Sequence, residues 1–197
     1  MAKQNALNNA SSAFTINDAY TFPTADGNAD DVLTTDGAGS VTWQPVSGGG
    51  FPVQQVYSQT ASIVNCSTVM PMDSTIPQSS EGTQVLTATI TPTSATNYLI
   101  IEFSYNGQST GSPSWISSAI FQDATANALF ADAQHWDNIC STYRSFRMTS
   151  GTTSSTTFKL RVGQSTTGNF YVNGLGPASV LFGGVSLATL MITEIQA

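Results

Sequence analysis

Hydrophobic and polar residues alternate in short runs through most of the chain after residue 50, which is the pattern of half-buried β-strands. The clearest run is 158–162, where Phe, Leu and Val alternate with Lys and Arg. Similar runs lie at 85–90, 98–105, 115–121, 126–131, 141–148, 170–172 and 185–195, with weaker candidates at 53–58 and 62–70. Gly, Pro, Asn and Ser separate them, and no stretch keeps a helical period beyond a turn or two. The sequence therefore predicts an all-β fold, with an antiparallel jelly-roll or β-sandwich head over residues 51–197.

The first 50 residues have a different pattern, in which isolated apolar side chains stand between turn sequences. The dipeptides Asp26–Gly27 and Asp36–Gly37 are turn signals, and Gly48–Gly50 is a flexible joint. So few apolar groups could hardly form a core within one chain. Copies of the chain could bury one another's anchors, so this region favours a short, intertwined oligomeric stem.

Composition limits the classes of partner. Charged residues make up 9% of the 197 residues, against about 25% in an average soluble domain, and the formal net charge is −7. Nucleic acid is not an expected partner, because phosphate contacts require clustered Lys and Arg. We also expect no membrane insertion, because the longest apolar-leaning stretch, 178–195, is interrupted by Ser, Thr and Gly, and no secretory signal is visible.

Residues suited to catalysis or metal binding are few. His135 is the only histidine, no Gly-x-Ser-x-Gly elbow is present, and a pair of His135 with Cys140 lacks an orienting third group. No pair of carboxylates of the kind that glycosidases use stands out. Residues 26–31 resemble the start of a calcium loop, but they lack its glycine at the sixth position and its glutamate at the twelfth. We expect no enzymatic activity, no metal and no cofactor.

The two cysteines, Cys66 and Cys140, lie far apart in the sequence. In a chain without a visible export signal they are most simply buried, reduced thiols. The sequence leaves a disulfide between them open, because spacing along the chain does not fix the distance between two side chains.

The segment 132–138 combines an indole with amide, carboxylate and imidazole groups, and we expect it to be a loop between two strands. An indole can stack on a sugar ring while polar groups bind its hydroxyls. The candidate receptor-binding residues are Asp132, Gln134, His135, Trp136, Asp137 and Asn138. The alternative is that Trp136 packs inward or against a neighbouring subunit, while the polar groups are only solvated.

Residues 19–43 carry anchors in a fixed order, approximately Y-x-F-P-x-x-D-G and then V-L-x-T-D-G-x-G-x-V-x-W. This pattern resembles a segment that precedes the terminal domains of bacteriophage tail fibres, head fibres and related virion proteins. The resemblance implies a trimeric stem in which the side chains facing the three-fold axis or an adjacent chain are Tyr20, Phe22, Leu33, Val41 and Trp43. The head resembles, in strand count and final strand, the trimeric domains of tumour-necrosis-factor-like and C1q-like proteins.

Together these features predict three parts: a virion-anchoring segment at 1–18, a trimerising stem with a glycine joint at 19–50, and the head at 51–197. The expected function is that of a structural and adhesive homotrimeric fibre on the surface of a bacteriophage particle, assembled in the bacterial cytoplasm. Its expected partners are other virion proteins, bound through the N-terminus, and a host cell-surface glycan. Two alternatives stay open, a capsid-decorating fibre without a specific receptor and a fibre tip that trims polysaccharide.

Overall fold

The computed structural model describes residues 15–16, 20–28, 31–45, 50–110, 114–136 and 138–197. The chain separates into two units, one up to Gly49 and the other from Gly50 onward. The division falls within the glycine run at 48–50. Most of the anchoring segment expected at 1–18 lies outside the described residues, so that assignment stays a prediction.

The N-terminal unit is built around a small hairpin. Strand β3 (Asp31–Thr35) pairs antiparallel with β4 (Val41–Pro45), and β1 (Thr15–Ile16) pairs with β2 (Tyr20–Thr21). The carboxylate of Asp36 closes the hairpin turn by accepting backbone N–H bonds from Ala38 at 2.7 Å and Ser40 at 3.0 Å. These bonds hold the pKa of Asp36 below its ordinary value.

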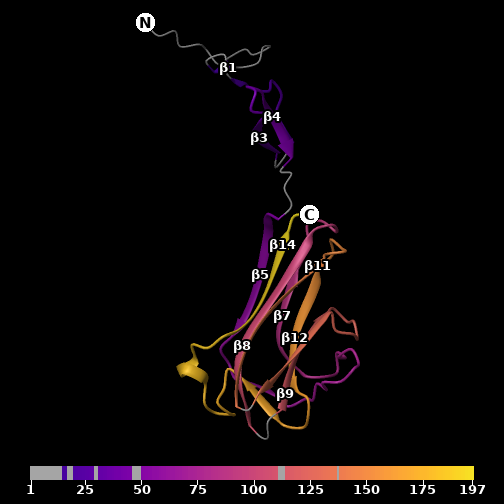
Figure 1. Ribbon diagram of the computed structural model, residues 1–197, viewed down its shortest axis with the longest axis vertical. Helices are drawn as coiled ribbons and strands as arrows, with labels where there is room; N and C mark the ends of the chain where they lie inside the picture. The colour runs from indigo at the N-terminus through magenta and orange to yellow at the C-terminus, as the bar shows by residue number, and fades with distance from the viewer. Residues whose placement is uncertain (1–14, 17–19, 29–30, 46–49, 111–113, 137) are drawn as a thin grey trace. The chain divides into compact units, whose positions relative to one another are not determined.

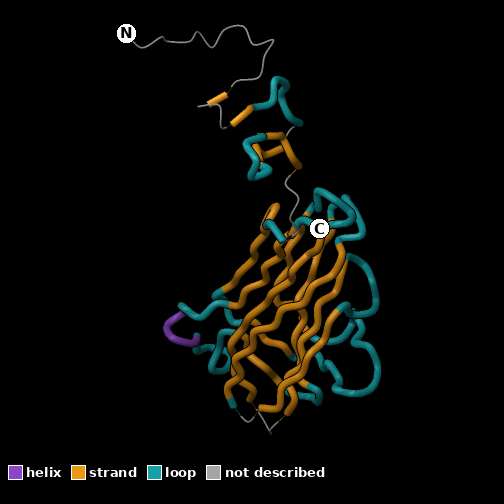
Figure 2. Tube along the Cα trace, turned by 45° about the horizontal axis from the view of Figure 1, so that its top comes forward, coloured by secondary structure: helices purple, strands orange, loops and turns teal. Residues whose placement is uncertain are grey.

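The head, from Gly50 onward, consists of antiparallel strands in two sheets (Figures 1 and 2). Its strands are β5 (Pro52–Thr60), β6 (Val64–Cys66), β7 (Thr83–Ile90), β8 (Tyr98–Thr110), β9 (Ser114–Gln122), β10 (Phe130–Trp136), β11 (Ile139–Thr149), β12 (Thr156–Gln164), β13 (Asn169–Val172) and β14 (Ala188–Ile195). A short 3-10 helix, η1 (Leu181–Gly184), lies between β13 and β14.

Strand order identifies the head as a jelly roll. One sheet has the order β10-β9-β12-β7. In the other, β8 lies between β14 and β11, with β5 beyond β14, while the short strands β13 and β6 continue along the far end of β8. The chain passes repeatedly from one sheet to the other, so strands that are distant in sequence become neighbours. The predicted all-β, antiparallel jelly-roll or sandwich fold is confirmed.

The core fills the space between the sheets. Each strand contributes alternate side chains, and the large, fully buried ones include Ile101, Phe103, Tyr105, Ile120, Phe158, Leu160, Phe170 and Ile192. Cys66 and Cys140 belong to this core and are not bonded to each other. Burial raises the pKa of the Cys66 thiol to about 12 and also raises that of Cys140, so both are unreactive at neutral pH.

Candidate functional site

The two sheets differ in how their outer faces are covered. The outward side chains of β5, β14, β8 and β11 form what we call the bare face. Its apolar and aromatic members are Val53, Tyr57, Tyr98, Ile100, Ile139, Tyr143, Met191 and Ile195, all at least partly exposed. Tyr57 and Tyr143 are 53% and 59% exposed. Within these four strands, the outward charged residues are Glu102 and Arg147.

Pairing between strands places the apolar groups of the bare face side by side. Met191 of β14 is the register partner of Tyr57 in β5 and of Glu102 in β8. Two residues further along β14, Thr193 is the register partner of Ile100 in β8. Because register partners point to the same face of a sheet, these residues form one continuous surface across the strands.

Several polar groups on the bare face are bonded within the chain. The hydroxyls of Ser104 and Thr189 lie 2.7 Å apart, and Gln55 donates to Thr193 at 3.0 Å. Tyr143 donates its hydroxyl to Glu102, and this bond raises the pKa of the Tyr143 phenol. These bonds satisfy part of the hydrogen-bonding capacity of the groups, which lowers the free-energy cost of covering the face with another protein surface.

The opposite sheet has part of its outer face covered by the chain itself, while Thr87, Thr89, Trp115 and Ala131 on that face stay exposed. Residues 67–82, which we call the cover segment, lie over it and bury Ala119 and Phe121 of β9 against Met70. Arg161 of β12 fixes the end of the cover segment by donating to the carbonyls of Glu81 and Gly82, both at 2.7 Å. At Gly163, a Cβ atom would come within 2.5 Å of the Thr68 carbonyl. The close approach therefore requires glycine at this position.

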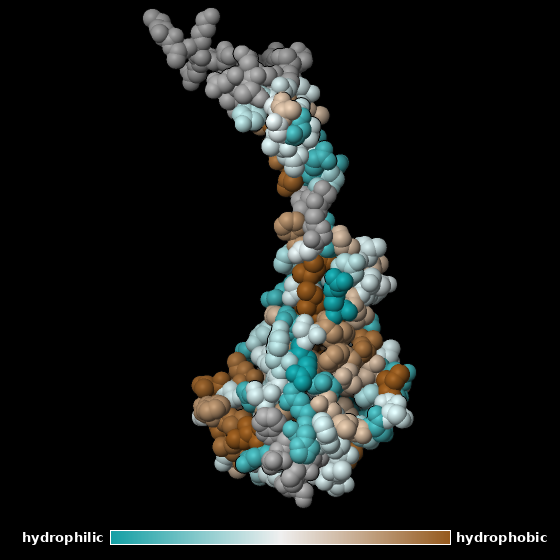
Figure 3. Space-filling view, in the orientation of Figure 1, coloured by the Kyte–Doolittle hydropathy of each residue, from teal (hydrophilic) through white to brown (hydrophobic). Residues whose placement is uncertain are grey.

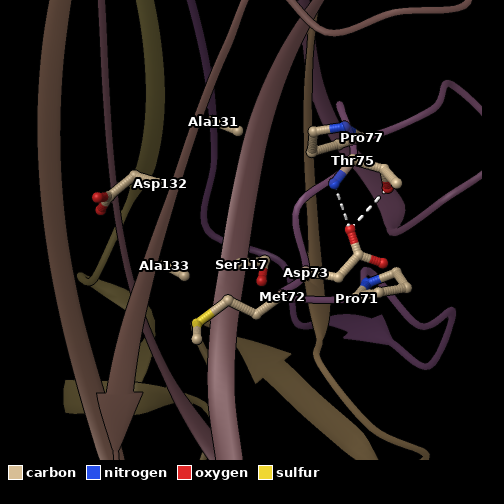
Figure 4. A pocket seen from close by; sticks show the side chains of 9 residues that line it. All are labelled: Pro71, Met72, Asp73, Thr75, Pro77, Ser117, Ala131, Asp132 and Ala133. Atoms are coloured by element: carbon tan, nitrogen blue, oxygen red, sulfur yellow. Dashed lines mark hydrogen bonds between the residues drawn. The ribbon is translucent and has the colours of Figure 1, made fainter.

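A hollow of about 190 Å³ remains between the cover segment and the strands β9 and β10 (Figure 4). It is lined by Pro71, Met72, Asp73, Thr75, Pro77, Ser117, Ala131, Asp132 and Ala133. Ser117 is 5% exposed, and among the described residues its hydroxyl has no hydrogen-bond partner. Asp73 accepts from the Thr75 backbone N–H at 2.7 Å and from the Thr75 hydroxyl at 2.6 Å, and these bonds lower its pKa.

The segment expected to be a receptor-binding loop is mainly strand. Residues 130–136 form β10, so the loop expectation is wrong for this part, while Asp137 and the side chain of Trp136 lie outside the described residues. Asn138 lies between β10 and β11, where its side chain accepts a hydrogen bond from Gln108. The prediction of a loop failed because β10 ends at Trp136 and β11 begins at Ile139, which leaves only residues 137 and 138 between the two strands.

Alternation along β10 divides the candidate receptor residues between two faces. Asp132 pairs with Arg144 of β11, at 2.5 and 2.6 Å from two guanidinium nitrogens. Gln134 lies beside Thr142, and turning its amide lets its oxygen accept from Arg144 at 2.6 Å. These two residues therefore join the strands β10 and β11.

His135 points to the other face of β10, where its ring makes an edge contact with Trp115, at 5.2 Å between centroids. Cys140 is buried in the core between the sheets, so His135 and Cys140 face different sides. The structure does not bring these two residues together as a nucleophile and base. Whether the candidate residues bind a receptor stays a prediction.

The expected trimer contacts belong to the N-terminal unit. Leu33 and Trp43 are register partners in the hairpin, and Val41 lies on the same face. Trp43 is already engaged within its own chain: its indole donates to the Ala25 carbonyl at 2.9 Å. The ring lies over Gly27, where a Cβ atom would come within 2.8 Å of it. Trp43 therefore orders the unit internally, and its role in a trimer stays a prediction.

The other two expected trimer contacts precede the hairpin. Tyr20 is 49% exposed, and Phe22 is partly buried. Thr21, between them, forms a parallel bridge with Ser40, which attaches this stretch to the end of the hairpin. Their assignment as contacts between chains likewise stays a prediction.

Glu194 is a buried residue that sequence analysis overlooked. Its carboxylate accepts from Gln54 at 2.6 Å, from Asn97 at 2.7 Å, and from the backbone and hydroxyl of Thr93, both at 2.8 Å. Burial acts to raise the pKa of Glu194, but these hydrogen bonds outweigh it and hold the pKa below 4.5. The sequence contained a signal for this burial, because alternation along the strand places Glu194 on the same inward face as Leu190 and Ile192.

A second apolar surface lies on the connection between β13 and β14. Its exposed members are Leu175, Val180, Phe182, Val185 and Leu187, and they gather at the lower left of the head in Figure 3. Phe182 is 76% exposed and adopts φ 49°, a left-handed conformation that favours glycine. The loop adjoins the bare face, since Asn106 of β8 donates to Ser186 at 3.2 Å.

The residues that the structure describes show neither a metal-binding cluster nor a membrane-spanning helix. Among these residues, no group of three or more His, Cys, Asp or Glu side chains could hold a metal ion. No described helix has the length and apolar character needed to cross a membrane.

Comparison with known proteins shows a similarity of fold and assigns no function. No family model matches the sequence, and no curated protein matches it. The structure is similar to Eiger TNF from S. frugiperda, with TM-score 0.43 and 14% identity over 75% of this chain and 94% of that one. Weaker likenesses are to dimeric latent PorU from Porphyromonas gingivalis (TM-score 0.33, 13% identity, 76% and 14% covered) and to the enzymatically active domain of bacteriophage CBA120 tailspike protein 4 (TM-score 0.22, 16% identity, 72% and 19% covered). At these TM-scores no functional residue is carried across, and the jelly-roll assignment rests on the strand order itself.

Proposed function

We propose that this chain is a non-catalytic, structural and adhesive homotrimeric fibre of a bacteriophage particle. Its N-terminal segment binds other virion proteins, and its head is displayed at the virion surface toward the host. The observation that carries the proposal is the bare face, a low-charge, aromatic and methionine-bearing sheet surface. Such surfaces are typical of the centre of protein interfaces. The resemblance of residues 19–43 to virion appendages supplies the biological setting.

A ring of three copies accounts for both apolar surfaces of the head. The bare face and the β13–β14 loop are different patches, and contact between different patches is heterologous. A heterologous contact closes into a ring when the rotation between copies is a whole fraction of a turn. The stem adds apolar groups of its own, since Tyr20, Val32 and Leu33 are each 44–49% exposed within one chain.

Light scattering on the purified chain tests the assembly. We expect a mass three times the 20.7 kDa of one chain, and a stable monomer would overturn the trimer. Electron microscopy of particles carrying a tagged copy tests the location. We expect the tag on fibres at the particle surface, and particles without label would contradict the virion assignment.

Deleting residues 1–18 tests the proposed anchor. We expect trimers that form normally but no longer occupy the particle. Normal occupancy by the shortened protein would place the anchor elsewhere in the chain.

A further inference from the structure

We propose that the hollow between the cover segment and the strands β9 and β10 binds one neutral sugar ring of a host surface glycan. The inference rests on the proposed adhesive function and gives it a site. This site lies on the outer face of the four-stranded sheet, and one residue suggested by the sequence, Asp132, is among those that line it.

The unpartnered hydroxyl of Ser117 is the first reason. A buried hydroxyl without a hydrogen bond costs about 1–3 kcal/mol, so a fold rarely keeps one without a use. Figure 4 shows this hydroxyl between Ala131 and Ala133 on one side and the turn from Asp73 to Pro77 on the other. A ligand hydroxyl entering the hollow would meet a group that can both donate and accept a hydrogen bond.

The remaining walls fit a sugar better than other small molecules. Asp73 keeps acceptor capacity beyond its two bonds to Thr75, so it suits a ligand that donates hydrogen bonds. Pro71, Met72 and the two alanines supply apolar surface for the ring carbons. At about 190 Å³ the hollow is smaller than the roughly 300–1,000 Å³ of sites for drug-sized ligands. One ring is therefore the unit that it accommodates.

Charge favours a neutral sugar over an acidic one. Two aspartates and no lysine or arginine line the hollow. The guanidinium of Arg144 is engaged with Asp132. Arg144 therefore compensates Asp132, and a carboxylate on the ligand would meet the charge of Asp73 with no lysine or arginine among the described lining residues.

A neighbouring aromatic pair extends the site along a glycan chain. Ser117 and Ala133 are register partners, and the next pair on the same face is Trp115 with His135. Trp115 is 38% exposed, so its indole is accessible beside the hollow. A second sugar ring would stack on this indole. Three copies of a weak site then give firm attachment through avidity.

Methyl NMR on the full chain tests the site directly. The five methionines give separate reporters, of which Met72 lines the hollow, Met191 lies on the bare face and Met148 packs against the core. We expect glucose, galactose or N-acetylglucosamine to shift the Met72 signal saturably, with a dissociation constant of about 1 mM. Met148 should not move. No saturable shift with any of the three sugars would overturn the proposal, and equal binding of sialic acid would overturn its charge argument.

Two variants link the signal to the hollow. Ser117→Ala should weaken sugar binding roughly tenfold while leaving the melting temperature unchanged or higher, because the lost hydroxyl has no hydrogen-bond partner among the described residues. Ala133→Leu should abolish binding by filling the hollow. Ser155→Ala, at an exposed loop position, is the matched control and should bind normally. Unchanged affinity in both hollow variants, or a clear fall in the melting temperature of Ser117→Ala, would overturn the proposal.

Light scattering on the same samples separates the two proposals. A monomer whose Met72 signal titrates would retain the sugar site and overturn the trimeric fibre. A trimer whose Met72 signal does not move would retain the fibre and overturn the site.

Discussion

The two sheets of the head have similar inner faces and very different outer ones. The chain covers part of the four-stranded sheet with its own residues 67–82, burying Phe121 completely. It leaves the outer face of the other sheet bare, with Tyr57 and Tyr143 more than half exposed. Large exposed aromatic side chains on the bare face are the feature expected if that face contacts another molecule, as proposed.

The strongest test places the same charge on each outer face. Ala119→Lys puts an ammonium group in a fully buried position whose register partner is Arg161. An uncompensated buried charge costs about 3–5 kcal/mol, so this variant should unfold or melt far below the parent in a circular dichroism scan.

Met191→Lys is the counterpart on the bare face. It should change the free energy of unfolding of the isolated chain by only about 0.5 kcal/mol, as surface substitutions do. Light scattering should nevertheless show loss of the trimer. If Met191→Lys unfolded the chain instead, the bare face would be covered from within and the contrast would fail.

Glu194→Gln tests whether the stability of the sheet with the bare face depends on the buried carboxylate of Glu194. The amide would turn a donor toward Gln54, Asn97 or Thr93, all of which already donate. We expect a loss of about 2–3 kcal/mol in urea unfolding at pH 7. The matched change Glu81→Gln, at a partly exposed position of the cover segment, should cost less.

Acid should remove the same stabilisation. The pKa of Glu194 is lowered on folding from its ordinary 4.5, so its contribution is complete above that value and is lost as pH falls through the folded pKa. The difference between the parent and Glu194→Gln should therefore shrink below about pH 4. A constant difference down to pH 2 would mean that the charge of Glu194 plays no part.

Phe182→Gly has the smallest expected effect and tests whether the apolar loop extends the interface. Glycine adopts φ 49° without the strain that phenylalanine carries, so the isolated chain should gain about 1 kcal/mol. Sedimentation at falling protein concentration should show weaker trimers. A variant that gains stability and associates normally would remove Phe182 from the interface.

Alternation along the sequence determined much of the fold. The run at 158–162 predicted a strand with Phe158 and Leu160 inside, and both are fully buried in β12. Because the period of a strand is two, pattern alone fixed which side chains share a face. The same alternation is seen in β8, where Glu102 lies on the opposite face from Ile101 and Phe103.

The sites depended on contacts that no local pattern contains. The run at 126–131 was shifted from β10 (Phe130–Trp136), because pairing with β9 defines the strand rather than its own weak alternation. Asp132 and His135 lie close in sequence but face opposite sides of that strand. The hollow joins Ser117 to Asp73, residues far apart in the chain. Periodicity assigns a side chain to one face of a sheet, whereas only the tertiary structure decides what covers that face. For this reason the sequence predicted a sandwich, but it did not predict the cover segment, the bare face or the hollow.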